Sequence, residues 1–249
     1  MAADRWLPAP AGPLALAPDE VHVWRASLRP PPHLLARLEA HLSPDERARA
    51  ARFRFPEHRT AFVAGRGVQR DILARYTGLA PAELAYREGS HGKPELDGAA
   101  AAGLRFNVSN SGDLALYAVT LRREIGVDLE QLKPMPDGMD IAQRFFSVPE
   151  NEVFAALGEE VRDLAFFRCW TRKEAYIKAV GEGLSMPLDR FDVAFAPGEP
   201  ARILRTRGNP AEAERWSMLA LEPGPGYVGA MAVEGTGWQA VLFDWHPAG

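Results

Sequence analysis

The chain has 249 residues, which is enough for one large domain or two of ordinary size. Hydrophobic residues make up 47% and charged residues 25%, so a sizeable core can form and general disorder is excluded. The net charge is 29 − 33 = −4, which disfavours non-specific nucleic-acid binding, and the single cysteine excludes a disulfide framework or a cysteine-based metal cluster. No apolar run approaches the roughly 20 residues of a membrane helix. Charges and prolines interrupt residues 1–13, so we expect no targeting segment and a cytoplasmic globular protein.

The first half of the chain reads as an arm followed by a strand and helices. Residues 1–20 are rich in Ala and Pro, and we expect a loose arm. The apolar spacing then predicts a strand at 21–24 and helices at 34–42, from 44 onward and over 56–76. Ser43 suits an N-cap and Glu46 closes a capping box, while Gly78 ends the last helix.

These helices are rich in arginine. Residues 37–76 hold nine arginines and five acidic residues, a local excess of 9 − 5 = 4 positive charges. The excess is typical of solvated helix faces, but it also suits an anion-binding surface in an otherwise acidic protein. The residues alone leave both interpretations open.

The rest of the chain begins with strands and ends with them. We expect strands at 114–120 and 125–129, a helix capped by Ser147 and ended by Gly158, a helix over 160–180 stopped by Gly181, and strands at 216–221, 227–233 and 238–245. The last three strands suggest an antiparallel sheet. Because helices and strands come in blocks, the fold class is α+β. The length fits two halves, 21–122 and 123–249, after the arm 1–20.

The first chemical pattern is Gly-Val-Asp-Leu-Glu at 126–130. Residues two apart on a strand share a face, so Asp128 and Glu130 lie together while Val127 and Leu129 point into the core. Two adjacent carboxylates repel unless a cation lies between them, and Mg²⁺ prefers such oxygen ligands. The alternative is a strand end with two solvated acids.

The second pattern lies in the helix over 160–180. Trp170, Glu174 and Lys178 are four residues apart and therefore line one face. Glu174 and Lys178 are also in the favourable order for an ordinary surface ion pair, and Trp170 could belong to the core. This pattern alone does not establish a site.

The third pattern is His-Gly-Lys-Pro at 91–94, followed by Phe-Asn-Val-Ser-Asn-Ser-Gly at 106–112. We interpret the first segment as a turn that carries Lys93, and the second as a Ser/Asn/Gly turn that enters a strand. Both can donate hydrogen bonds to phosphate. Both could equally be surface turns.

Taken in order, the motifs HGKP, FNVSNS, GVDLE, FFxxWxxKEAxxK and GxGL resemble the 4′-phosphopantetheinyl transferase superfamily. The similarity spans about residues 43–193 and is greatest to the large two-domain subgroup that activates peptide and polyketide synthetases. It implies two similar α+β halves related by a pseudo-twofold axis, with coenzyme A in the cleft between them. It also implies transfer of the phosphopantetheine arm to a serine of an acyl or peptidyl carrier protein, with release of adenosine 3′,5′-bisphosphate.

The resemblance assigns roles to single residues. Asp128, Glu130 and Glu174 match the family's Mg²⁺ ligands, and Lys178 matches a lysine that contacts the pyrophosphate. Lys178 and the metal would stabilise charge on the leaving oxygen. Glu174 is the candidate general base for the incoming serine.

The resemblance also predicts the coenzyme A contacts: Lys93, Ser109, and, at the nucleotide end, Arg49, Arg59 and Thr60. One position departs from the family. Where it commonly has a histidine near the coenzyme's 3′-phosphate, this chain has Asn110, which can donate a hydrogen bond but cannot become cationic. The departure puts tight recognition of that phosphate in doubt, and leaves the chemistry intact.

Two other functions stay open at this point. The carboxylates alone permit another Mg²⁺-dependent enzyme that cleaves a pyrophosphate. A non-catalytic relative could bind carrier proteins without modifying them. The complete order of motifs argues against the first, and the intact Asp128, Glu130, Glu174 and Lys178 argue against the second. We expect a monomer, because a cleft between two halves of one chain needs no partner subunit.

Overall fold

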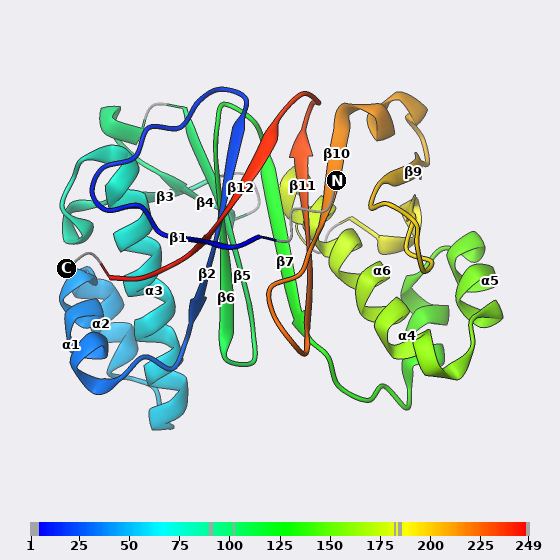
Figure 1. The fold of residues 1–249 in the computed structure, drawn as a ribbon, viewed down its shortest axis with the longest axis horizontal. Coiled ribbons are helices and arrows are strands. Elements are labelled where there is room, and N and C mark those ends of the chain that lie inside the picture. The colour runs from blue at the N-terminus through cyan, green and yellow to red at the C-terminus, as the bar shows by residue number, and fades with distance from the viewer. Residues whose placement is uncertain (1–4, 90–91, 102, 182, 184–185, 248–249) are drawn as a thin grey trace.

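The computed structural model describes residues 5–89, 92–101, 103–181, 183 and 186–247. Helices flank a central pair of β-sheets (Figure 1). On one side lie α1 (Pro32–His41), α2 (Pro44–Ala50) and α3 (Pro56–Thr77); on the other lie α4 (Gly138–Phe145), α5 (Val148–Ala156) and α6 (Glu159–Val180). None of the described helices is long and apolar enough to cross a membrane. The mixture of helices and sheets confirms the α+β class.

The strands form two main sheets and two short hairpins. The five-stranded sheet has the order β1 (Leu7–Pro8), β12 (Gln239–Asp244), β2 (Glu20–Ser27), β6 (Leu114–Leu121), β5 (Leu104–Ser111). The three-stranded sheet has the order β10 (Trp216–Leu221), β11 (Tyr227–Glu234), β7 (Ile125–Gln131). The hairpins are β3 (Tyr86–Glu88) with β4 (Pro94–Leu96), and β8 (Phe191–Val193) with β9 (Ile203–Thr206). Short 3₁₀ helices cover Pro81–Glu83, Ala99–Ala101, Leu188–Arg190 and Pro210–Arg215.

Four of the predicted helix ends are confirmed, but Gly158 is the N-cap of α6, and α5 already ends at Ala156 with Leu157 as its C-cap. Ser43 caps α2 and Ser147 caps α5, each with a complete capping box. Helices α3 and α6 end at Gly78 and Gly181, whose φ angles of 72° and 82° lie in the left-handed region that favours glycine. Local sequence therefore sets where these helices start and stop.

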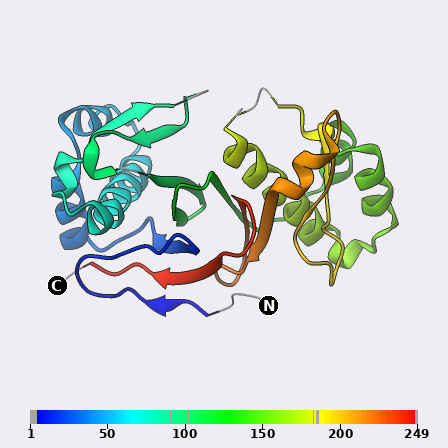
Figure 2. The same cartoon turned by 90° about the horizontal axis from the view of Figure 1, so that it is seen from above.

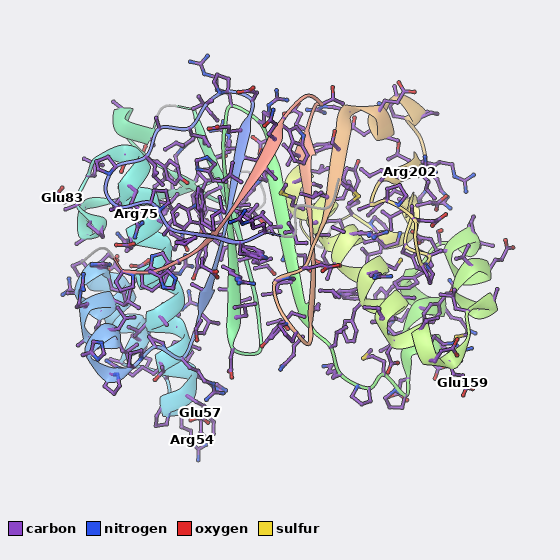
Figure 3. All side chains as sticks on the ribbon, in the orientation of Figure 1. Arg54, Glu57, Arg75, Glu83, Glu159 and Arg202 are labelled. Atoms are coloured by element: carbon purple, nitrogen blue, oxygen red, sulfur yellow. The ribbon has the colours of Figure 1, made fainter. Side chains whose placement is uncertain are left out.

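The expectation of a loose N-terminal arm is wrong for its described part. Strand β1 pairs in parallel with β12, and Leu14 and Leu16 pack against the core under α3. Arg75, labelled in Figure 3, donates to the carbonyl oxygens of Pro10 (3.1 Å) and His246 (2.9 Å). A single buried guanidinium on α3 thus binds segments near both ends of the chain. The apolar side chains of the arm are ordered because they pack against the core.

The last strand also departs from expectation. β10 and β11 are antiparallel as predicted, but β12 leaves them and runs parallel to β2 in the other sheet, between β1 and β2 (Figure 2). Leu242 enters the core between the two sheets, and Phe243 enters the core beneath α3. Because β12 pairs with β1 and β2, residues 239–244 lie in the sheet of the first half, although we placed them in the second.

Helix α6 lies directly on β7. A Cβ at Gly126 would be 2.1 Å from the Ala175 carbonyl oxygen and 2.3 Å from the Ala179 amide nitrogen. Only a glycine allows the two backbones to approach this closely. Val127 and Leu129 point away from α6 into the core between the sheets, as predicted. The opposite face of β7 therefore presents Asp128 and Glu130 beside the helix.

Candidate active site

Strand β5 meets β7 through side chains. Alternate β5 side chains accept hydrogen bonds from alternate β7 amides: Asn107 from Val127 (2.9 Å), Ser109 from Leu129 (3.3 Å) and Ser111 from Gln131 (3.1 Å). We expected Ser109 to lie in a turn, and this is wrong, because β5 continues to Ser111. Its polar residues are satisfied by the neighbouring strand, so they do not break the strand.

Asp128 forms the centre of the site. Its side chain is only 6% exposed, and Oδ1 accepts hydrogen bonds from Lys178 Nζ (2.5 Å) and Ser109 Oγ (2.9 Å). Lys178 Nζ also reaches Ser109 Oγ (3.0 Å) and the carbonyl oxygen of Val127 (3.3 Å). The contact joins β5, β7 and α6. The alternative of two solvated acids is therefore wrong for Asp128.

The second oxygen of Asp128 lacks a partner. Oδ2 is buried and makes no hydrogen bond to the described residues. Burial raises the pKa of Asp128, and the charge of Lys178 opposes that rise. A buried carboxylate oxygen without a donor is costly, so this atom is a candidate to bind a cation or a proton donor supplied by a ligand.

Glu130 and Glu174 complete an acidic group. Glu130 Oε2 accepts from Ser111 Oγ (2.8 Å). Burial raises the pKa of Glu130, and Asp128 adds to the rise. Burial also raises the pKa of Glu174, with further contributions from the Asp128 and Glu130 charges. Lys178 pairs with Asp128, and no ion pair joins it to Glu174 among the described residues. The surface-pair alternative is thus not what the helix forms.

The donor chemistry suits Mg²⁺. In the part of the chain that the structure describes, no three acidic, histidine or cysteine side chains converge enough to enclose a metal ion by themselves. Mg²⁺ seldom needs such a cage, because it keeps waters and binds through one or two carboxylates plus substrate phosphates. The unpartnered Asp128 Oδ2 and the mutually repelling carboxylates fit that mode.

A cavity of about 480 Å³ opens on the other side of β5, against α2 and α3. Its polar lining includes Arg49, His58, Arg66, Asn107 and Asn110. Among the described residues, neither arginine has an acidic ion-pair partner. A neighbouring cavity of about 350 Å³ shares His58 and includes Thr60. The lining is locally cationic in an acidic protein, which suits an anionic ligand.

This answers the question that the arginine-rich segment left open. Arg59 pairs with Glu39, Arg70 with Glu46 and Arg75 with Asp71, so three of the nine arginines have acidic partners, while the local excess of four positive charges remains. Arg49 and Arg66 remain directed to the cavity. The segment is therefore partly structural and partly a cationic surface.

Two predicted coenzyme contacts lie elsewhere. Arg59 faces α1 through its ion pair, outside the cavity lining. Lys93 Nζ contacts Glu124 Oε2 (3.1 Å) and the carbonyl oxygens of Ile125 (3.1 Å) and Ala179 (3.4 Å). Burial lowers the pKa of Lys93, while Glu124 opposes the change. Their ligand roles stay predictions.

The motif residues His91, Leu184 and Ser185 lie outside the described residues.

His58 and Arg66 were not singled out from the sequence. With Ala61, Phe62, Gly65 and Gln69 they recur at helical spacing along one face of α3, and that whole face lines the cavity. The spacing was visible in the sequence. Which face of the helix meets β5 was not.

The raised pKa of Glu174 predicts a gain in stability when its charge is removed. Because the folded state holds the proton more tightly than the unfolded state, ionised Glu174 destabilises the fold at neutral pH, and this cost disappears as pH falls. With divalent ions chelated, Glu174→Gln should raise Tm by about 1–4 °C at pH 7.5 and by less at pH 4.5. The exposed Glu152→Gln on α5 serves as the control, with no expected change. A lower Tm for Glu174→Gln at pH 7.5 contradicts this electrostatic account.

Comparison with known proteins identifies the family to which the chain belongs. Residues 124–232 match a family model described as the 4′-phosphopantetheinyl transferase superfamily. Residues 26–122 match the model of the N-terminal part of a 4′-phosphopantetheinyl transferase. Together these models span both halves of the chain.

Curated relatives point the same way. The 4′-phosphopantetheinyl transferase HetI of Nostoc sp. is 46% identical over 97% of this chain and 98% of its own length. A putative 4′-phosphopantetheinyl transferase of Synechocystis sp. is 36% identical over 63% of this chain and 64% of its own. The transferase Sfp of Bacillus subtilis is 32% identical over 63% and 68%. The chain therefore belongs to the 4′-phosphopantetheinyl transferase superfamily, and its activity is transfer of 4′-phosphopantetheine to carrier proteins.

Proposed function

We propose that the protein takes the phosphopantetheine arm from coenzyme A in a Mg²⁺-dependent reaction and releases adenosine 3′,5′-bisphosphate. The observation that carries this proposal is the position of β5 between the cationic cavity and the Asp128–Lys178 contact. Asn107 and Asn110 line the cavity, while Ser109, between them, bonds Asp128 and Lys178. One strand thus connects a phosphate-binding surface to the reacting groups.

The cavity is suited to the nucleotide end of coenzyme A. Arg49 and Arg66 provide two cations for its phosphates, and Asn110 provides a neutral hydrogen bond where the family often has histidine. His58 lines the same cavity, so the cavity contains an imidazole although the motif position holds asparagine. These contacts support binding at a distance from the transferred phosphorus.

The reaction itself is a displacement at phosphorus. The carrier serine oxygen forms a bond to the phosphorus of the phosphopantetheine phosphate, and the bond to the bridging oxygen breaks. Glu174 accepts the serine proton, a role that its raised pKa suits. Lys178 stabilises the negative charge that develops on the leaving oxygen. When bound to Asp128, Glu130 and Glu174, Mg²⁺ supplies further positive charge to the pyrophosphate.

The partner and the assembly belong to the same proposal. The acceptor is an acyl or peptidyl carrier protein, as the sequence resemblance implies, and the reaction takes place in the cytoplasm. The protein acts as a monomer, because one chain supplies the cavity, Asp128, Glu174 and Lys178.

The proposal is tested by weighing an apo carrier protein after incubation with the enzyme, coenzyme A and Mg²⁺. We expect a gain of one phosphopantetheine arm, lost when the metal is chelated, and a rate at least roughly 10²-fold lower for Glu174→Gln. Breakdown of coenzyme A without carrier modification would instead indicate a pyrophosphate hydrolase. Binding of the carrier without either product would indicate a non-catalytic relative.

The cavity is tested by neutralising its arginines. Arg66→Ala should raise the KM for coenzyme A more than it lowers kcat, because Arg66 acts away from the transferred phosphorus. The matched change Arg215→Ala, which breaks an exposed ion pair with Glu234 outside the cavity, should have a smaller effect. The difference should shrink at high salt because screening weakens exposed charges. Equal KM effects for the two variants would contradict this assignment of the cavity.

A further inference from the structure

The seam between β5 and β7 repeats one hydrogen-bond unit twice. In the first unit, the Leu129 amide donates to Ser109 Oγ (3.3 Å), and that hydroxyl donates to Asp128 Oδ1 (2.9 Å). In the second, the Gln131 amide donates to Ser111 Oγ (3.1 Å), and that hydroxyl donates to Glu130 Oε2 (2.8 Å). Each serine therefore joins a β7 carboxylate to the amide of the residue that follows it.

This arrangement fixes the direction of each hydroxyl proton. A serine hydroxyl has one proton and two acceptor positions. Because the β7 amide N–H can only donate and an ionised carboxylate can only accept, the hydroxyl proton is directed to the carboxylate. The seam thus sets both the strand register and the orientation of the two acids. The period of two residues on β5 matches the period of two on β7, which places both units on the same face.

The second unit is the simpler one. Ser109 also contacts Lys178, so its removal would disturb several groups at once. The Ser111 hydroxyl bonds only Glu130 and the Gln131 amide among the described residues. Among the described residues, no hydrogen-bond donor contacts the other carboxylate oxygen of Glu130. That oxygen is available to a ligand while the Ser111 hydroxyl holds Oε2.

We propose that Ser111 is a positioning residue that orients the Glu130 carboxylate toward a bound divalent cation. The inference rests on the proposed function, which makes Glu130 a metal ligand. Without the Ser111 hydroxyl, Glu130 must lose rotamer freedom when it binds the cation. Groups that orient a metal ligand in this way typically change metal affinity by about 10–100-fold when they are removed.

The test measures Mn²⁺ affinity by electron paramagnetic resonance, with and without coenzyme A, for matched variants. Ser111→Ala should bind Mn²⁺ about 10–100-fold more weakly than the wild type. Ser111→Thr keeps a hydroxyl and should restore affinity to within about threefold. Ser27→Ala is the control, because this β2 hydroxyl accepts from the Arg29 amide and does not contact β7. Its affinity should not change.

A second pair of variants separates a loss of stability from a loss of Glu130 positioning. Ser111→Thr and Ser111→Val have nearly the same shape and differ mainly in the hydroxyl, so a loss of affinity confined to Ser111→Val supports the inference even where both lower Tm. Equal affinities for these two variants would overturn it and leave the transferase proposal intact. A wild type that transfers the arm but binds no Mn²⁺ in either condition would overturn both the metal assignment and the role of Ser111.

Discussion

The site depends on the direct contact of the α6 backbone with β7 at Gly126. Because no side chain separates the helix from the strand there, Lys178 contacts Asp128, and Glu174 lies near enough for the Asp128 charge to raise its pKa. A helix held even one methyl group farther away would withdraw the ammonium from the carboxylate. The glycine of the Gly-Val-Asp-Leu-Glu segment is thus as much a part of the site as its two acids.

The buried charge of Asp128 is tolerated because several elements satisfy it together. An isolated carboxylate at this depth is expensive, and its pairing with Lys178 and Ser109 offsets the cost. Removing Lys178 would leave the carboxylate without a compensating charge, whereas removing Ser109 would take away one hydrogen bond to Oδ1. The same low exposure makes the group effective, because electrostatic interactions are stronger where water is excluded. The proposed mechanism therefore relies on the same three side chains that stabilise this part of the fold.

Local sequence predicted much of this structure, and long-range pairing explains the rest. The capping boxes at Ser43 and Ser147, the shared face of Asp128 and Glu130, and the position of Glu174 and Lys178 on α6 follow from spacing alone. β5 was misinterpreted because its polar residues bond amides about 20 positions away. β12 was assigned to the wrong sheet because its partner, β2, lies near the other end of the chain. The ion pair of Arg59 and the face of α3 that lines the cavity likewise could not be predicted from the sequence, because both depend on how the helices pack.

The most direct test of this account is the free energy of unfolding of Gly126→Ala, measured in urea beside Gly65→Ala. At Gly126 the added methyl meets fixed backbone atoms, and we expect a loss of at least about 2 kcal/mol. At Gly65, within α3, a Cβ would lie 3.5 Å from the nearest side chain, and the helix should gain up to about 1 kcal/mol. If Gly126→Ala is as stable as the wild type, α6 does not rest on β7 as described, and the geometry of Asp128, Glu174 and Lys178 must be different.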